Sequence, residues 1–172
     1  MGFRPKLPRF LALFVVLPLV ALAEERVPSI LCYGDSLTAG YGLVPEKAWP
    51  AQLQEMVNEA GLEGEVRNAG LSGETTAGGV SRLDWMLRRH VDIFILALGA
   101  NDFLRGLPLD QTRKNLQTMI ERVREKYPEA RIILAGMKAP PNLGPDYTRR
   151  FESIFPQLAE KNDLTLIPFL LE

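Results

Sequence analysis

The segment VPSILCYGDSLTAGY, residues 27–41, decides the fold of this chain. Its first part, Val27–Tyr33, is a short and mostly apolar run that ends at a glycine, a pattern typical of a buried β-strand. Its second part turns polar at once and brings Asp35 and Ser36 just beyond the expected strand. In open α/β sheets, ligands bind outside the carboxyl ends of the strands, so Ser36 is a candidate functional residue.

The rest of the chain alternates between strand and helix patterns. Further short apolar runs predict strands at Glu65–Asn68, Val91–Leu98, Ala130–Ala135 and Leu164–Phe169. Apolar residues at helical spacing predict helices over 49–60, 80–87, 116–127 and 147–158. We expect Thr75 or Thr76 to cap the second helix and Pro156 to kink the fourth. This alternation predicts an α/β domain with three layers, α/β/α, around a five-stranded parallel sheet.

The composition is that of an ordinary globular domain. Of the 172 residues, 47% are hydrophobic and 24% are charged, and 20 basic against 21 acidic residues give a formal net charge of −1. This length suits one domain with its own core. A nucleic-acid-binding protein would need a basic surface stripe, which this balance does not indicate, so we expect no nucleic-acid partner.

Residues 1–23 have the pattern of a secretory signal peptide. Basic residues stand within the first nine positions, Phe10–Leu22 is almost wholly apolar, and Ala21-Leu22-Ala23 fits an A-x-A cleavage site. The alternative is an uncleaved membrane anchor, but the run is short for a bilayer and Pro18 interrupts it. We therefore expect a periplasmic or secreted protein without a stable membrane anchor, with its mature domain over residues 24–172.

Polar turns follow the first three predicted strands. They read GDSLTAGY at residues 34–41, NAGLSGET at 68–75 and LGAND at 98–102. The carboxyl ends of parallel strands share one edge of a sheet, so we expect Ser36, Gly73 and Asn101 to lie near one another. A hydroxyl nucleophile with amide donors for a developing oxyanion is the set of groups that acyl transfer requires.

The three blocks, in this order, resemble those of the GDSL/SGNH hydrolases. The longer strings GANDFLRG at 99–106 and APPNLGPDY at 139–147 place the resemblance nearest the bacterial branch of periplasmic arylesterases, lysophospholipases and acyl-CoA thioesterases. The resemblance implies the flavodoxin-like SGNH hydrolase fold and a serine esterase that hydrolyses carboxylic or thio esters. It also implies a small-molecule ester or lipid substrate, no cofactor, and a monomer when the domain is complete.

By the same resemblance, Ser36 is the nucleophile. Its backbone N–H, the N–H of Gly73 and the side-chain amide of Asn101 would form the oxyanion hole. Each residue also has a plain structural alternative: Ser36 or Asn101 could cap a helix, and Gly73 could serve only a turn. We expect Asp35 and Asp102 to hold their loops by hydrogen bonds rather than to act as bases.

The catalytic pair that the resemblance implies, in a final D-x-x-H block followed by a closing helix, is not found in the 172 residues. The only histidine, His90, is expected at the end of the second helix, away from Ser36. We therefore expect a C-terminally incomplete domain that lacks its last helix and leaves Ile30, Cys32, Ile167 or their neighbours on that face of the sheet bare. A non-catalytic remnant that binds acyl or ester ligands is the alternative to an enzyme.

Other site classes find little support. Gly70-Leu71-Ser72-Gly73 nearly spells the G-x-S-x-G elbow of α/β-hydrolases, but Glu74 stands in place of the last glycine. No phosphate-binding glycine motif is present, and one histidine with one cysteine does not make a metal-ligand pattern. We expect Cys32, within the first strand, to be an ordinary buried side chain.

Overall fold

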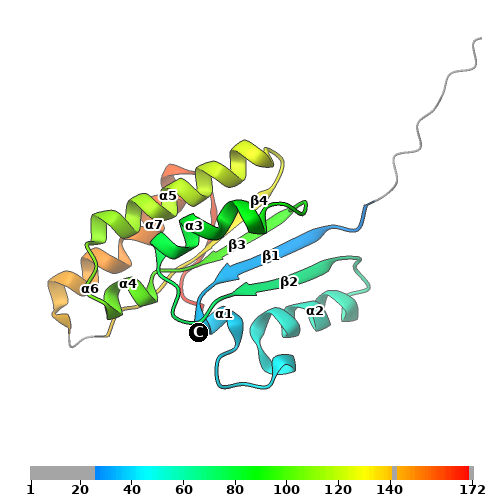
Figure 1. Cartoon of the computed structure of the whole chain (residues 1–172), viewed down its shortest axis with the longest axis horizontal. Helices are drawn as coiled ribbons and strands as arrows, with labels where there is room; N and C mark the ends of the chain where they lie inside the picture. The colour runs from blue at the N-terminus through cyan, green and yellow to red at the C-terminus, as the bar shows by residue number, and fades with distance from the viewer. Residues whose placement is uncertain (1–25, 141–142, 171–172) are drawn as a thin grey trace, which may run out of the picture.

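The computed structural model describes residues 26–140 and 143–170, so the expected signal peptide lies outside the described part. Its centre is a parallel sheet with the strand order β2-β1-β3-β4-β5 (Figure 1). The strands are β1 Ser29–Gly34, β2 Glu65–Gly70, β3 Ile93–Ala97, β4 Arg131–Ala135 and β5 Thr165–Ile167. This is the flavodoxin-like order of a doubly wound sheet, so the predicted fold class is confirmed.

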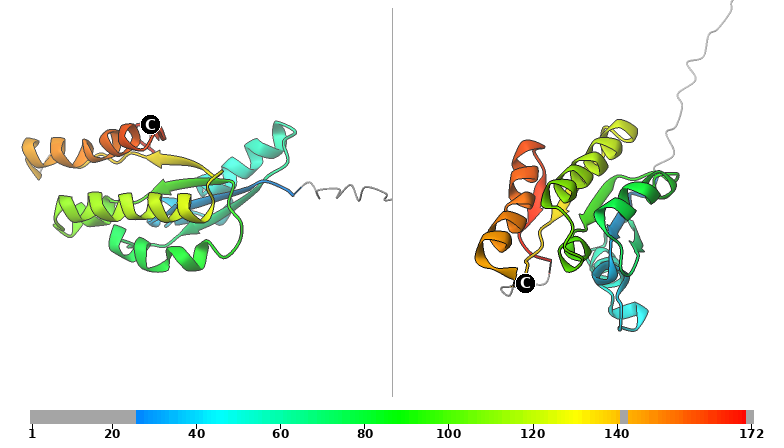
Figure 2. Two further views of the ribbon diagram at one scale, coloured as in Figure 1. Left: turned by 90° about the horizontal axis from the view of Figure 1, so that it is seen from above. Right: turned by 60° about the vertical axis from the view of Figure 1, so that its left-hand side comes forward.

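Helices cover both faces of the sheet. The longer ones are α2 Trp49–Glu59, α3 Thr76–Met86, α5 Leu109–Lys126, α6 Pro145–Glu152 and α7 Ile154–Lys161. Short helices, α1 Ser36–Ala39, η1 Pro45–Lys47 and α4 Ala100–Leu104, stand in the loops after β1 and β3. The left view of Figure 2 places α3 and α5 on one side of the sheet and α2 on the other, which gives three layers.

The larger core lies between the sheet and the helices α3, α5 and α7. Leu31 and Tyr33 of β1 and Phe94 and Leu96 of β3 point into it, because alternate strand residues face the same side. The smaller core, under α2, is made of Ile30, Cys32 and Ile95. Burial raises the pKa of the Cys32 thiol to about 12, so this cysteine stays protonated and is the ordinary buried side chain that was expected.

The α2 side of the sheet is only partly covered. Ile30 and Cys32 are buried there beneath Trp49, Leu53 and Val57, so the expectation that they lie bare is wrong. Further along the sheet on this side, Ile93 and Ile133 are half-buried. Ile167 is also half-buried, but it packs against the larger core. A helix placed early in the chain thus protects the first strand.

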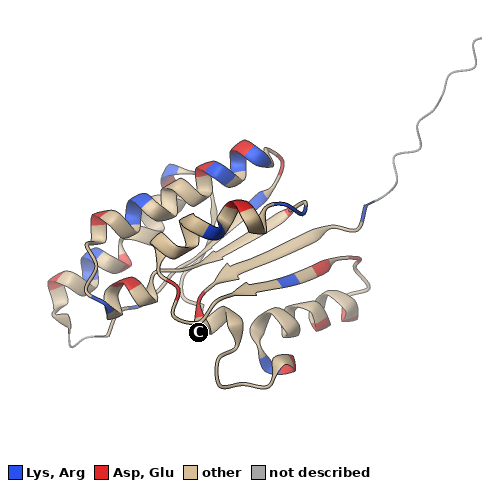
Figure 3. Cartoon of the chain, viewed as in Figure 1, with Lys and Arg blue, Asp and Glu red and all other residues tan. Residues whose placement is uncertain are grey.

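Most of the charged residues of α5 are exposed. Figure 3 shows both signs interspersed along α5 rather than one sign gathered into a stripe. No helix in the described ranges is both long enough and apolar enough to cross a membrane.

Most of the expected elements are found, with two local differences. The fourth predicted helix is two helices, and the break falls at Ser153 between α6 and α7 rather than at Pro156. The loop that the sequence suggested after β3 is instead largely the short helix α4, and Phe103 packs edge-on against Phe151 with ring centroids 5.1 Å apart.

Candidate active site

Three turns meet at the carboxyl edge of the sheet, where β2, β1 and β3 are neighbours. The strand order reverses between β1 and β3, since the chain moves outward to β2 and then returns to the other side of β1. Such a switch point is where doubly wound folds bind ligands. The turns that carry Ser36 and Asn101 follow these two strands, so the sheet brings both predicted residues to this edge.

Ser36 is the first residue of α1. Asp35 caps this helix, because its Oδ1 accepts a hydrogen bond from the N–H of Leu37 at 3.0 Å. Ser36 is half-buried, and within the described part of the chain its own N–H donates to no protein acceptor. The residue therefore offers a partly accessible hydroxyl and a free backbone donor side by side.

A close approach of backbone to side chain explains the glycine two positions before Ser36. A Cβ on Gly34 would lie 2.0 Å from Oγ1 of Thr38 and 2.7 Å from the carbonyl oxygen of Ala97. No larger residue fits there without moving α1 away from the end of β3. The absence of a side chain at Gly34 therefore allows α1, which begins with Ser36, to pack closely against the end of the sheet.

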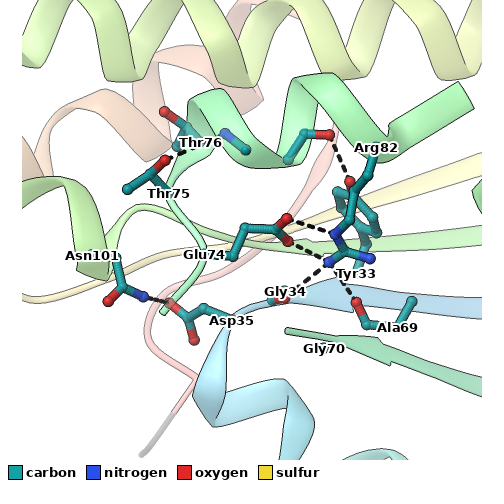
Figure 4. Close-up of polar contacts among 12 residues, drawn as sticks. Tyr33, Gly34, Asp35, Ala69, Gly70, Glu74, Thr75, Thr76, Arg82 and Asn101 are labelled. Carbon is teal, nitrogen blue, oxygen red and sulfur yellow. Dashed lines mark hydrogen bonds and ion pairs between the residues drawn. The ribbon is translucent and has the colours of Figure 1, made fainter. Parts of the chain in front are cut away.

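Asn101 contacts the Ser36 turn through Asp35. Its Nδ2 donates to Asp35 Oδ2 at 3.3 Å, although the two residues are 66 positions apart (Figure 4). Asp35 is fully buried. Burial raises the pKa of its carboxyl, and hydrogen bonds from Leu37 N–H and the Asn101 amide partly offset that rise. The predicted placement of Asn101 beside the Ser36 turn is thus observed.

Gly73 stands in a tight turn after β2. The N–H of Glu74 donates to the carbonyl of Leu71 at 3.1 Å, and Gly73 has a φ of 80°, which glycine adopts readily. Arg105, from the segment after β3, donates to the Gly73 carbonyl at 2.6 Å. Among the described residues no protein group accepts from the N–H of Gly73, so this donor is free for a ligand.

Asp102 joins the second and third turns. Its carboxylate accepts from the N–H of Thr76 at 2.8 Å, from the Thr76 hydroxyl at 2.5 Å and from the Thr112 hydroxyl at 3.1 Å. Asn115 donates to the Thr76 hydroxyl at 3.0 Å. All four side chains are buried. The hydrogen bonding expected of Asp35 and Asp102 is therefore present in both.

Ser72 and His90 stand apart from these groups. Ser72 is exposed at the second position of the Leu71–Glu74 turn. His90 precedes β3, at the amino edge of the sheet, where its Nε2 lies 3.2 Å from Oδ1 of Asp92 and its ring lies edge-on to Tyr127. Since Asn101 follows the opposite end of β3, His90 lies at the edge remote from the site, as predicted.

Sequence reasoning did not find the partly buried ion pair between Arg82 of α3 and Glu74 (Figure 4). Glu74 belongs to the quoted turn block, but Arg82 stands inside a helix and carries no local signal. No cluster of His, Cys, Asp or Glu that could hold a metal ion occurs within 26–140 and 143–170.

Comparisons with known proteins agree with this geometry. The model of the GDSL-like lipase/acylhydrolase family matches residues 32–172. An arylesterase of Vibrio mimicus is 39% identical over 163 residues, which are 94% of this chain and 79% of that protein. The thioesterase 1/protease 1/lysophospholipase L1 of Escherichia coli (strain K12) is 35% identical over 166 residues, which are 92% of this chain and 74% of that protein.

Solved structures give the same result. The crystal structure of AlinE4, an SGNH-hydrolase family esterase, matches with a TM-score of 0.80 and 42% sequence identity over 85% of this chain and 78% of that one. The family model spans β1 from Cys32 onward and includes all three turns at the carboxyl edge. The chain therefore belongs to the GDSL-like lipase/acylhydrolase family, a family of ester hydrolases.

Proposed function

We propose that this protein hydrolyses carboxylic esters or thioesters through an acyl-enzyme on Ser36. The hydrogen bond between Asn101 and Asp35 carries this proposal. It joins an amide donor to the residue that precedes the serine, and the free N–H of Ser36 lies at the same turn. A nucleophilic hydroxyl beside preorganised donors favours acyl transfer over other chemistry.

In the first step, Ser36 Oγ attacks the carbonyl carbon of the ester and passes its proton to a base. The N–H groups of Ser36 and Gly73 and the amide of Asn101 stabilise the resulting oxyanion. The tetrahedral intermediate collapses, the bond to the alcohol or thiol breaks, and the leaving group takes up the proton. Water then cleaves the acyl-enzyme by the same steps and releases the acid.

The base is not His90, which lies at the opposite edge of the sheet. The resemblance assigns this role to an Asp–His pair in a D-x-x-H block, and residues 1–172 contain no such block. We propose that a block of this kind supplies the base. Without it, the oxyanion hole and substrate binding alone would leave a residual acceleration of about 10³–10⁴ over water.

Exposed apolar residues near the carboxyl edge of the sheet and the names of the relatives support the substrate class that we propose. Large apolar side chains are exposed on the loops after β1, β2, β3 and β4, and these are Tyr41, Leu43, Val44, Leu71, Leu104 and Leu143. Such residues suit an acyl or aryl group. The names of the relatives point to aryl esters, lysophospholipids or acyl thioesters. We infer a monomer that meets these substrates in the periplasm or outside the cell, after removal of residues 1–23.

The proposal is tested by comparing the 172-residue chain with the same chain extended by a D-x-x-H block. The extended chain should hydrolyse a short aryl ester and an acyl thioester. Ser36→Ala should abolish both activities, whereas Ser72→Ala, a matched change in the neighbouring turn, should keep them. An extended chain that binds the esters without turning them over would support the non-catalytic alternative instead.

A further inference from the structure

A partly buried ion pair lies at the end of the turn that carries Gly73. The Glu74 side chain is 3% exposed and the Arg82 side chain 21% exposed. Arg82 Nε donates to Glu74 Oε1 at 2.6 Å, and Arg82 Nη2 donates to Oε2. Two parallel charge-assisted bonds of this kind fix the orientation of both side chains, not only their distance.

Arg82 also holds the ends of two strands. Its Nη2 donates to the carbonyl of Ala69 in β2 at 2.7 Å and approaches that of Gly34 in β1 at 3.3 Å (Figure 4). Its guanidinium lies over the ring of Tyr33, 4.2 Å from the ring centroid. A single side chain of α3 thus contacts the carboxyl ends of both strands that precede the first two turns of the site.

These contacts fix the Gly73 turn at both ends. At its start, the N–H of Leu71 donates to the Gly34 carbonyl at 2.9 Å, and at its end Glu74 is held by Arg82, which approaches the same carbonyl. Gly34 is two residues before Ser36. The position of the Gly73 N–H relative to Ser36 therefore depends on the Gly34 carbonyl and the ion pair, together with the bond from Arg105 to the Gly73 carbonyl.

We infer that Arg82, acting through Glu74, is a positioning residue that sets the Gly73 N–H at the distance from Ser36 that the oxyanion requires. This inference rests on the proposed function of Ser36. Arg82 and Glu74 are not among the groups that we propose to contact the oxyanion. Their effect is on the transition state, because a donor that is held slightly out of place binds the ester nearly as well but stabilises the oxyanion less.

Lysine is the discriminating substitution at position 82. It keeps the positive charge beside Glu74, but its ammonium is a point charge that cannot form two parallel bonds or stack flat on Tyr33. The matched control is Arg122→Lys on α5. Arg122 also contacts α3, through the Val80 carbonyl at 3.1 Å and Asp84 at 3.6 Å, but it lies outside the site.

The experiment compares Arg82→Lys, Glu74→Gln, the double variant and Arg122→Lys, each in the chain extended with a D-x-x-H block. In Arg82→Lys we expect kcat for a short aryl ester to fall about tenfold, below the loss expected for a deleted donor, while KM changes less than about twofold. Glu74→Gln should have a similar effect, and the double variant should lose no more than about threefold beyond the larger single loss, because the pair acts as a unit. Arg122→Lys should leave kcat unchanged.

A second measurement does not depend on turnover. In two-dimensional NMR spectra, the amide signals of Gly73 and Ser36 should shift in Arg82→Lys and stay in place in Arg122→Lys. Unchanged amide signals, or a loss of kcat no larger than in Arg122→Lys, would overturn the inference. If Ser36→Ala kept full activity, the proposed function would fail, and the amide signals would still decide whether Arg82 positions Gly73.

Discussion

Asn101 donates its side-chain amide to the buried carboxyl of Asp35, 66 positions earlier in the chain, at 3.3 Å. This bond joins the turn after β3 to the turn after β1 across the switch point of the sheet. Burial raises the pKa of the Asp35 carboxyl, and the hydrogen bond from Asn101 offsets part of this rise. One contact therefore orients the expected oxyanion donor and opposes part of the rise in the pKa of the carboxyl beside Ser36.

The first prediction concerns the pH dependence of stability in Asp35→Asn. Because folding raises the pKa of Asp35, the folded chain binds the proton more tightly than the unfolded chain. The stability that this group contributes is present in full below the ordinary pKa of 3.8 and is lost as pH rises through the raised folded pKa. The free energy of unfolding of Asp35→Asn, relative to the unchanged protein, should therefore increase between about pH 3 and about pH 7. Urea titrations at the two pH values test this, and a difference that stays constant or decreases would refute it.

The second prediction concerns the oxyanion donor. In a chain extended with a D-x-x-H block, Asn101→Ala should lower kcat by about 10²–10³, the usual cost of one lost donor. KM should change less, because the donor matters most after the oxyanion has formed. Steady-state kinetics with a short aryl ester provide the measurement. An unchanged kcat in a folded variant would leave Asn101 with a structural role only.

The third prediction concerns the buried polar network around Asp102. Asp102→Ala should lower the free energy of unfolding by about 2–4 kcal/mol, since it leaves the buried N–H and hydroxyl of Thr76 without their acceptor. The control is Asp84→Ala, whose carboxylate is 77% exposed and lies 3.6 Å from Arg122. Denaturant unfolding should show a change below about 1 kcal/mol for the control. Equal losses in the two variants would show that the network contributes little.

The fourth prediction concerns His90. Its side chain is 43% exposed, and it contacts Asp92 and Tyr127 at the amino edge of the sheet. His90→Gln should therefore leave the ester hydrolysis of the 172-residue chain and of the extended chain unchanged. A clear loss of kcat in either protein, with the circular dichroism spectrum intact, would mean that His90 contributes to the chemistry.

The sequence predicted the sheet well because its strands carry local signals. Phe94 and Leu96 belong to a continuous apolar run, as buried parallel strands require. Thr75 caps α3 by accepting from the Gly78 N–H at 3.3 Å, as its position before the helical pattern predicted. The turns that bear Ser36, Gly73 and Asn101 were found because each directly follows a predicted strand.

Other features could not be found from local pattern. The helices α1 and α4 are four and five residues long, too short to show a helical period. The protection of Ile30 and Cys32 depends on how α2 crosses the sheet. The contact of Arg82 in α3 with the Gly34 carbonyl in β1 spans 48 positions, so only the folded chain reveals it.

The most direct test of the account is to find which serine becomes acylated. A chain extended with a D-x-x-H block should react with a fluorophosphonate probe, and peptide mass spectrometry should place the adduct on Ser36. Ser36→Ala should abolish the adduct, whereas Ser72→Ala should retain it. An adduct that persists in Ser36→Ala and disappears in Ser72→Ala would contradict the central claim that Ser36 is the nucleophile.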